Sequence, residues 1–139
     1  MDKPQSSKAR QIGEAAMAYE QWQTGHSPES VTVVMSAQTL VITLHGALSP
    51  AERALARSPQ GAAQVQEFHR QLFLSSSDSL RQEIKRITGV EVSEATAEMK
   101  AESGMLVKVF STGTLVHVFL LARDVEAECW SGTVAGAHS

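Results

Sequence analysis

Histidine, serine and glutamate side chains that could do acid–base chemistry lie within eight residues of one another, about a third of the way along the chain. His45 ends a β-rich segment, and Ser49 and Glu52 follow it. A histidine and a carboxylate can act as acid and base when both line one pocket. The alternative is a helix N-cap, because a serine oxygen can accept from the Glu52 amide while that carboxylate returns to the cap amide. We favour the cap, with Pro50 at the first helical position.

Basic residues follow this cap. Arg53 and Arg57 are four residues apart, on one face of the expected helix, and with His45 they are the candidate contacts for a ligand or an acidic partner. His69 is expected on a helix surface and His117 beside an apolar strand face. The three histidines together show no ligand spacing that predicts a metal site. The remaining bases alternate with acids, which favours a solvated, salt-bridged face: Arg70, Arg81, Lys85 and Arg86 with Glu67 and Glu83.

Other catalytic or cofactor patterns are missing from the sequence. Cys129 is the single cysteine, so no intrachain disulfide is expected, and no neighbouring base would activate its thiol. No glycine-rich phosphate loop occurs. The net charge of −3 and the 5% aromatic content argue against nucleic acid as a partner. We therefore predict no catalytic residue, no cofactor and no metal, and a non-enzymatic protein.

The elements that position these residues follow from apolar spacing and turn residues. The 139 residues suffice for one domain. Three- and four-residue apolar spacing predicts a helix over residues 7–23, and alternation predicts a hairpin of strands 31–35 and 40–45. A short helix to about residue 57 and a long helix over 59–88 follow, with a serine-rich middle that favours a bend or break. The expected apolar stripe of the long helix is Val65, Phe68, Leu72, Leu80, Ile84 and Ile87.

The C-terminal part is less regular. Residues 90–100 are open between strand and helix, 105–110 form a strand, and 115–121 form another strand or its continuation past a bulge. From residue 123 onward a loose tail is expected. The order of elements predicts an α+β fold, a two-layer sandwich in which helices cover one face of an antiparallel sheet of four to five strands.

The other sheet face is predicted to be apolar. Val34, Val41, Leu106 and Phe110 share it, which is more apolar surface than a monomer leaves in water. Either the C-terminal strand and tail cover this face or a second copy does. We favour a homodimer with these four residues as the candidate interface.

Three motifs resemble the MpsC-like family of small bacterial proteins, formerly a domain of unknown function. They are Gly46-Ala47-Leu48-Ser49-Pro50-Ala51-Glu52, Ser58-Pro59-Gln60-Gly61 and Ile84-Lys85-Arg86-Ile87-Thr88-Gly89-Val90. The resemblance implies one domain over residues 9–111, a hairpin from Val90 to Phe110 with Gly104 at its turn, and therefore a strand at 90–100. Residues 112–139 would then be a C-terminal extension.

The family name implies a Na⁺-translocating, membrane-potential-generating system whose membrane partners resemble bicarbonate-uptake and NADH-dehydrogenase-like proteins. We expect a soluble, cytoplasmic accessory or regulatory protein that acts through protein–protein contacts and reaches the inner membrane through a partner. No membrane span or signal peptide is expected in the sequence. The alternative function is a small-ligand or ion sensor, with a pocket at the dimer interface near His45 and the helix N-terminus at Ser49. Acid–base catalysis by His45 with Glu52 ranks last.

Overall fold

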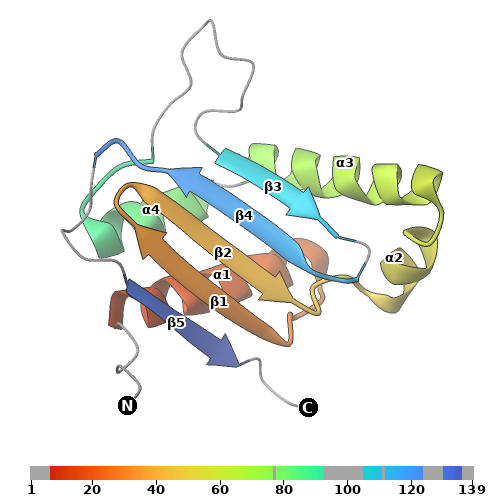
Figure 1. Ribbon diagram of the computed structural model, residues 1–139, viewed down its shortest axis with the longest axis horizontal. Helices are drawn as coiled ribbons and strands as arrows, with labels where there is room; N and C mark the ends of the chain where they lie inside the picture. Colours follow the sequence, from red (N-terminus) through yellow and green to blue (C-terminus); the bar gives the residue numbers. More distant parts are fainter. Residues whose placement is uncertain (1–6, 77, 93–104, 111, 124–129, 136–139) are drawn as a thin grey trace, which may run out of the picture.

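The computed structural model describes residues 7–76, 78–92, 105–110, 112–123 and 130–135, which form an α+β fold with a five-stranded antiparallel sheet (Figure 1). The helices lie on one side of the sheet, as predicted. The elements in chain order are α1 (Ser7–Thr24), β1 (Ser30–Ser36), β2 (Thr39–His45), α2 (Pro50–Leu55), α3 (Pro59–Ser76), α4 (Asp78–Thr88), β3 (Met105–Val109), β4 (Leu115–Leu120) and β5 (Trp130–Ala135).

The strands are arranged in the order β3-β4-β2-β1-β5, so the first hairpin lies in the centre and later strands extend it on both sides. The register places Val34 opposite Val41 and Val41 opposite Val118. Val118 in turn pairs with Leu106 of β3. A row of aliphatic positions therefore crosses four adjacent strands on one face of the sheet.

Alternation separates this outer face from the core. The side chains that point toward the helices are almost all buried and apolar, as expected for strands with one face packed. They are Val31, Val33, Met35, Leu40, Ile42, Leu44, Val107, Val109, Leu115 and Phe119. His117 is the polar member of this buried face among the described strand residues, and it is 1% exposed.

Helix α1 packs against β1, β5 and α4 through small and aliphatic residues. A side chain at Gly13 would place its Cβ 2.8 Å from a methyl group of Val134, so glycine allows β5 to approach the helix closely. The apolar stripe of α1 contains Ile12, Ala16 and Tyr19, as its spacing predicts, but Trp22, the last residue of the expected stripe, is 74% exposed. Glu20 follows directly and is buried as well, which the spacing does not indicate.

Helices α2 and α3 begin at the two predicted serine caps. Ser49 forms the complete capping box with Glu52. Ser58 accepts a hydrogen bond from the Gly61 amide at 3.0 Å. A Cβ at Gly61 would lie 1.9 Å from the carbonyl oxygen of Leu55, so the close α2–α3 junction requires glycine.

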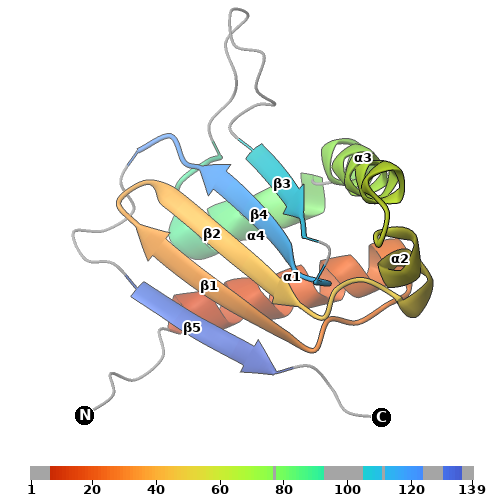
Figure 2. The same ribbon diagram turned by 45° about the vertical axis from the view of Figure 1, so that its right-hand side comes forward.

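The long predicted helix is two helices. The serine-rich segment contains the break, and residue 77 lies outside the described residues. In Figure 2, α3 is seen nearly end-on while α4 lies across the view behind the sheet. The predicted buried stripe on α3 is partly wrong. Val65 is buried as predicted, but Phe68 is 52% exposed and Leu72 is half-buried. The next residues along the chain, His69 and Phe73, are buried instead.

Helix α3 also protects the edge of the sheet. The side-chain amide of Gln66 donates to the Val107 carbonyl at 2.9 Å and accepts from the Val109 amide at 2.7 Å. These two backbone groups belong to the edge strand β3. An edge whose groups are paired in this way is less available to another strand.

The C-terminal third agrees with the prediction in part, because the strands expected at 105–110 and 115–121 are present as β3 and β4. Residues 93–104, with Gly104 and most of the strand expected at 90–100, lie outside the described residues; Val92 forms an isolated bridge to Leu121. Strand β3 pairs with β4, and the expected loose tail contains strand β5. Because β5 is rich in small residues, its apolar pattern is weak and gives little strand signal. It extends the sheet beside β1 and does not cover its outer face.

Candidate functional site

Two of the predicted interface residues, Val34 and Val41, lie on the outer face of the sheet, which we define by Val34, Val41, Val116 and Val118. Phe110 directly follows β3. Val34 is 41% and Phe110 is 45% exposed, and the three other valines are half-buried. None of the described helices or strands packs over this face (Figure 1). The backbone of the fourth predicted residue, Leu106, occupies β3 in the same aliphatic row, and its side chain is not among those described.

The candidate ligand contacts separate into two places. Arg53 and Arg57 line an open groove of about 560 Å³ with His26 and Glu29, which we call the arginine groove. His26 Nε2 lies 3.0 Å from the Gly46 carbonyl oxygen, so this nitrogen carries the proton and donates. His45 does not line the groove. Its Nε2 lies 3.2 Å from the hydroxyl of Thr32, on the outer face of the sheet.

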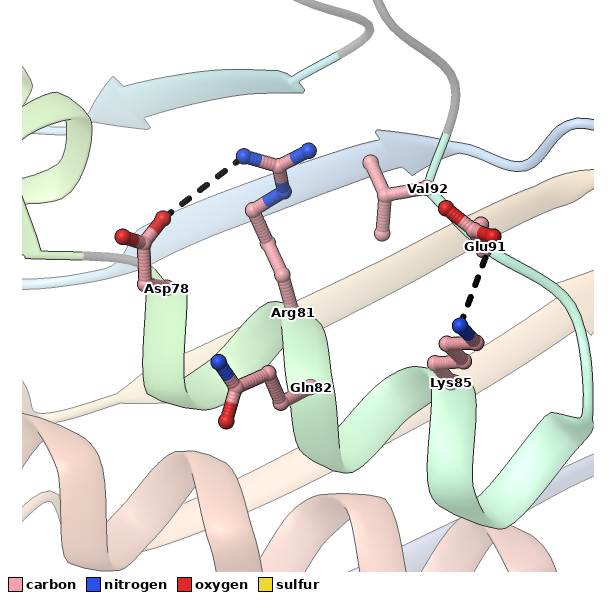
Figure 3. A pocket seen from close by; sticks show the side chains of 6 residues that line it. All are labelled: Asp78, Arg81, Gln82, Lys85, Glu91 and Val92. Atoms are coloured by element: carbon pink, nitrogen blue, oxygen red, sulfur yellow. Dashed lines mark ion pairs between the residues drawn. The ribbon is translucent and has the colours of Figure 1, made fainter.

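A second polar groove, of about 340 Å³, lies along α4 (Figure 3). Arg81 and Lys85 project from one side of the helix. Arg81 is 3.7 Å from Asp78, and Lys85 is 3.4 Å from Glu91. The two positive and two negative charges balance. Such exposed pairs contribute little to stability and leave no charge that attracts a ligand.

The core holds an unusual group of polar side chains, which we call the polar core cluster: Tyr19 and Glu20 from α1, Glu52 from α2, His69 from α3 and His117 from β4. His69 Nε2 donates to Glu52 Oε2 at 2.7 Å, and His69 Nδ1 lies 3.9 Å from Glu20 Oε2. Glu20 and His69 are only 2% and 3% exposed. One imidazole thus lies between two carboxylates inside an otherwise apolar core.

Local structure explains how Glu52 reaches this position. Its Oε1 accepts from the Ser49 amide at 3.0 Å and from the Ser49 hydroxyl at 3.1 Å, which fixes the carboxylate at the start of α2. The other oxygen is then directed at His69. The capping box and the hydrogen bond to His69 use the two oxygens of one side chain, so the cap interpretation is confirmed but incomplete.

Burial perturbs the ionisation of the cluster. Desolvation and the nearby Glu52 charge raise the pKa of Glu20 to about 7. Burial alone would raise the pKa of Glu52, but the Ser49 and His69 hydrogen bonds outweigh it and the net pKa is lowered. Burial, with the nearby His69, lowers the pKa of His117 to about 3, so its ring is neutral. Near pH 7 the cluster therefore has an ionised Glu52 and a Glu20 that can hold or release a proton.

A cleft on the surface leads to Glu52. It has a volume of about 300 Å³ between the end of α1, α2 and α3, and we call it the helix cleft. Leu55 and Phe68 are exposed apolar residues of its wall, and the Glu52 side chain is 20% exposed. Its lining is Gln23, Thr24, Ser49, Glu52, Leu55, Gln64, Val65 and Phe68.

These positions limit the chemistry. Glu52 is paired with His69 and Ser49, and no described pocket holds both His45 and Glu52. Among the residues the structure describes, no three His, Cys, Asp or Glu side chains are placed to hold a metal ion. What the cluster can do is hold a proton between carboxylate and imidazole groups shielded from water.

The sequence analysis missed His69, Glu20 and His117 as functional candidates. His69 was expected on the surface, and the correction follows from the packing of α3, whose buried stripe runs through residues 65, 69 and 73. A signal was available for His69, because it lies four residues from both Val65 and Phe73. Nothing in the spacing brings Glu20 to it.

The fold and these sites define a small α+β domain with an open, apolar sheet face and a buried carboxylate–imidazole cluster. Within the described ranges, no helix is both long and apolar enough to cross a membrane. The chain belongs to the MpsC family, described as a Na⁺-translocating membrane potential-generating system, whose family model matches residues 5–122. The matched region includes β4 and ends before β5. It therefore extends past residue 111, where the motifs led us to expect the end of the family domain.

A relative in Bacillus subtilis adds no function. The chain is 26% identical over 126 residues to a protein of Bacillus subtilis (strain 168) described as "Uncharacterized protein YbcI". The aligned region covers 91% of this chain and 94% of that protein. No solved structure matches this chain.

Proposed function

We propose that this protein is a non-enzymatic accessory or regulatory component that acts through protein–protein contacts beside a cation-linked or inorganic-carbon-linked membrane transport system. Family membership supports the link to a membrane potential-generating system. The observation that carries a contact-based mechanism is the outer face of the sheet, where Val34, Val41, Val116 and Val118 form continuous apolar surface. Contiguous exposed apolar surface is typical of an interaction site.

A second copy of the chain is the proposed occupant of this face. Five strands about 4.8 Å apart and about 20 Å long present roughly 500 Å². Two copies would bury roughly 1,000 Å², which is near the lower limit for a specific interface. Among the described residues, Lys108 is the only Lys, Arg, Asp or Glu side chain on this face, so two copies can pack face to face with little charge repulsion. The expected product is a weak, reversible homodimer.

Light scattering over a range of concentrations tests the assembly. We expect a dimer that dissociates on dilution and a monomer at every concentration for Val34→Glu. Phe68→Glu introduces the same charge at an exposed apolar residue of the helix cleft and serves as the matched control. A monomeric wild type, or equal dissociation of both variants, would contradict assembly through the outer face.

The transport role needs its own test. Membrane vesicles from cells that lack the protein are energised, and the Na⁺-dependent membrane potential is followed with a voltage-sensitive dye. We expect added wild-type protein to restore the potential seen in vesicles from complete cells. Val34→Glu should restore less. No response to the wild-type protein, with intact vesicle energisation, would refute the proposed role.

The second candidate function is a sensor of small anions, and the arginine groove favours it. Arg86 and Arg70 each pair with a glutamate three residues away. Arg53 and Arg57 have no such partner within the described residues, although both line the same groove. Two guanidinium groups four residues apart match the oxygen atoms of a carboxylate, bicarbonate or phosphate.

Thermal unfolding distinguishes this function, because a ligand that binds the folded state raises the melting temperature. Bicarbonate, phosphate and nucleotides are compared at equal ionic strength. We expect a shift that disappears in Arg53→Gln/Arg57→Gln and persists in Arg86→Gln. No anion-specific shift, or the same shift in both variants, would exclude the groove as a sensor site.

A further inference from the structure

Three buried polar atoms of the polar core cluster have no hydrogen-bond partner of good geometry within the described part of the chain, although the Gln23 side chain lies near the Tyr19 hydroxyl. They are Tyr19 Oη, Glu20 Oε2 and His117 Nδ1. Glu20 Oε2 is 3.9 Å from His69 Nδ1, too far for a direct hydrogen bond. A buried polar atom left unpaired is costly, and most such atoms in folded proteins bind another group or an ordered water.

All three residues line one small internal cavity. It has a volume of about 10 Å³ and is lined by Tyr19, Glu20, Gln23, His69, Leu72, Phe73 and His117. One water molecule needs roughly 10–15 Å³ and two to four polar partners. The cavity has the size for one water and presents the number of partners that a buried water uses.

We propose that this cavity is a binding site for a single water molecule, which bridges Tyr19, Glu20 and His117 beside the His69–Glu52 pair. The hydrogen-bond donors and acceptors balance. The Tyr19 hydroxyl donates to the water, and the water donates to Glu20 Oε2 and to His117 Nδ1. This arrangement places the proton of the neutral His117 ring on Nε2.

Water also suits both protonation states of Glu20. With Glu20 protonated, the carboxylic acid donates to the water, which still donates to His117 and now accepts from two hydroxyls. With Glu20 ionised, the water donates to it instead. A water has two donors and two acceptors, so in both states each of the three protein groups keeps a partner, and with Glu20 protonated only one water hydrogen is left without an acceptor. A fixed cation would favour the ionised state alone.

The charged and titratable groups around the water come from each element packed on the cavity. They are Tyr19 and Glu20 of α1, His69 of α3 and His117 of β4, with Glu52 of α2 behind His69. Phe73 stacks on the His117 ring with centroids 4.4 Å apart and seals the site on that side. The water is therefore expected to exchange slowly with bulk solvent.

A crystal structure of the full chain at a resolution that shows ordered water tests the proposal. We expect one density peak about 2.7–3.2 Å from the three atoms. An empty cavity, or side chains turned to bond one another directly, would overturn the proposal. A peak about 2.4 Å from its ligands that appears only with a sodium salt would also overturn it, because it would indicate a cation.

Oxygen-17 relaxation dispersion provides the test in solution by counting long-lived internal waters. Tyr19→Phe removes one partner and should retain the water with two. Tyr19→Phe/His117→Leu leaves one partner, and the count should fall by one relative to Tyr19→Phe. An unchanged count in a folded double variant would refute the site, and the wild-type crystal structure decides the question if that variant does not fold.

Discussion

Replacing Glu20 by glutamine should change how stability depends on pH, because the folded protein binds the Glu20 proton more tightly than the unfolded chain does. Burial and the Glu52 charge raise its pKa from 4.5 to about 7. Between these values the folded state holds the proton that the unfolded state has released. The free energy of unfolding contributed by this group therefore falls as the pH rises through this window.

The magnitude follows from the size of the shift. Each unit of pKa difference corresponds to about 1.4 kcal/mol, so the full effect is about 3 kcal/mol. The effect is absent below pH 4, grows between 4.5 and 7, and is complete above pH 8. Glu20→Gln cannot ionise and should lack it. Changed hydrogen bonding in the variant adds an offset that does not depend on pH, so the pH-dependent part of the difference in unfolding free energy is the informative quantity.

Urea unfolding at several pH values between 4 and 8.5 measures this difference. We expect wild type to lose about 3 kcal/mol relative to Glu20→Gln across the range. Glu83→Gln is the control, since Glu83 is exposed and Arg86 lowers its pKa. A difference between wild type and Glu20→Gln that stays constant with pH would refute the buried, proton-binding role of Glu20.

Further substitutions test the packing and the caps by urea unfolding. Gly61→Ala should destabilise the protein by about 2 kcal/mol or more, because the α2 carbonyl occupies the position of the new methyl group; a neutral effect would contradict the junction. Phe73→Ala should lower the free energy of unfolding by about 3–5 kcal/mol and Phe68→Ala by less than about 1 kcal/mol, because only Phe73 is buried. A larger loss for Phe68→Ala would show that the stripe predicted from the sequence is the buried one. Ser49→Ala should cost about 1 kcal/mol through the lost cap. Between pH 3 and 6.5 the unfolded His117 ring binds a proton that the folded ring does not, so the free energy of unfolding of wild type should rise with pH across this range. His117→Leu should lack this rise.

The fold was accessible from the sequence wherever local chemistry specifies an element. The alternation around Val34 and Val41 predicts both strands of the first hairpin and assigns their outer and inner faces correctly. The serines at positions 49 and 58 mark the starts of α2 and α3. Strand β5 was not accessible, because its pairing with β1 depends on a helix glycine, Gly13, that lies far from it in the sequence.

The polar core cluster was inaccessible for a related reason. Residues 65, 68, 69, 72 and 73 all recur at helical spacing, so α3 has two neighbouring stripes that could each be the buried one. Apolarity favours the stripe with Phe68 and Leu72. The α2–α3 junction at Gly61 orients the other stripe inward, and His69 then meets Glu52 from the capping box and approaches Glu20 from α1.

Each of these side chains has a conventional interpretation when it is considered alone. Glu52 completes a helix cap, Glu20 follows an apolar stripe, and His69 lies beside another such stripe. Their chemistry arises only when three helices and a strand converge on one point of the core. Loss of either partner of the His69–Glu52 hydrogen bond would leave the other polar group without that partner in a largely buried position, which is costly. The cluster therefore places the Glu20 proton where α1, α2 and α3 meet in the core.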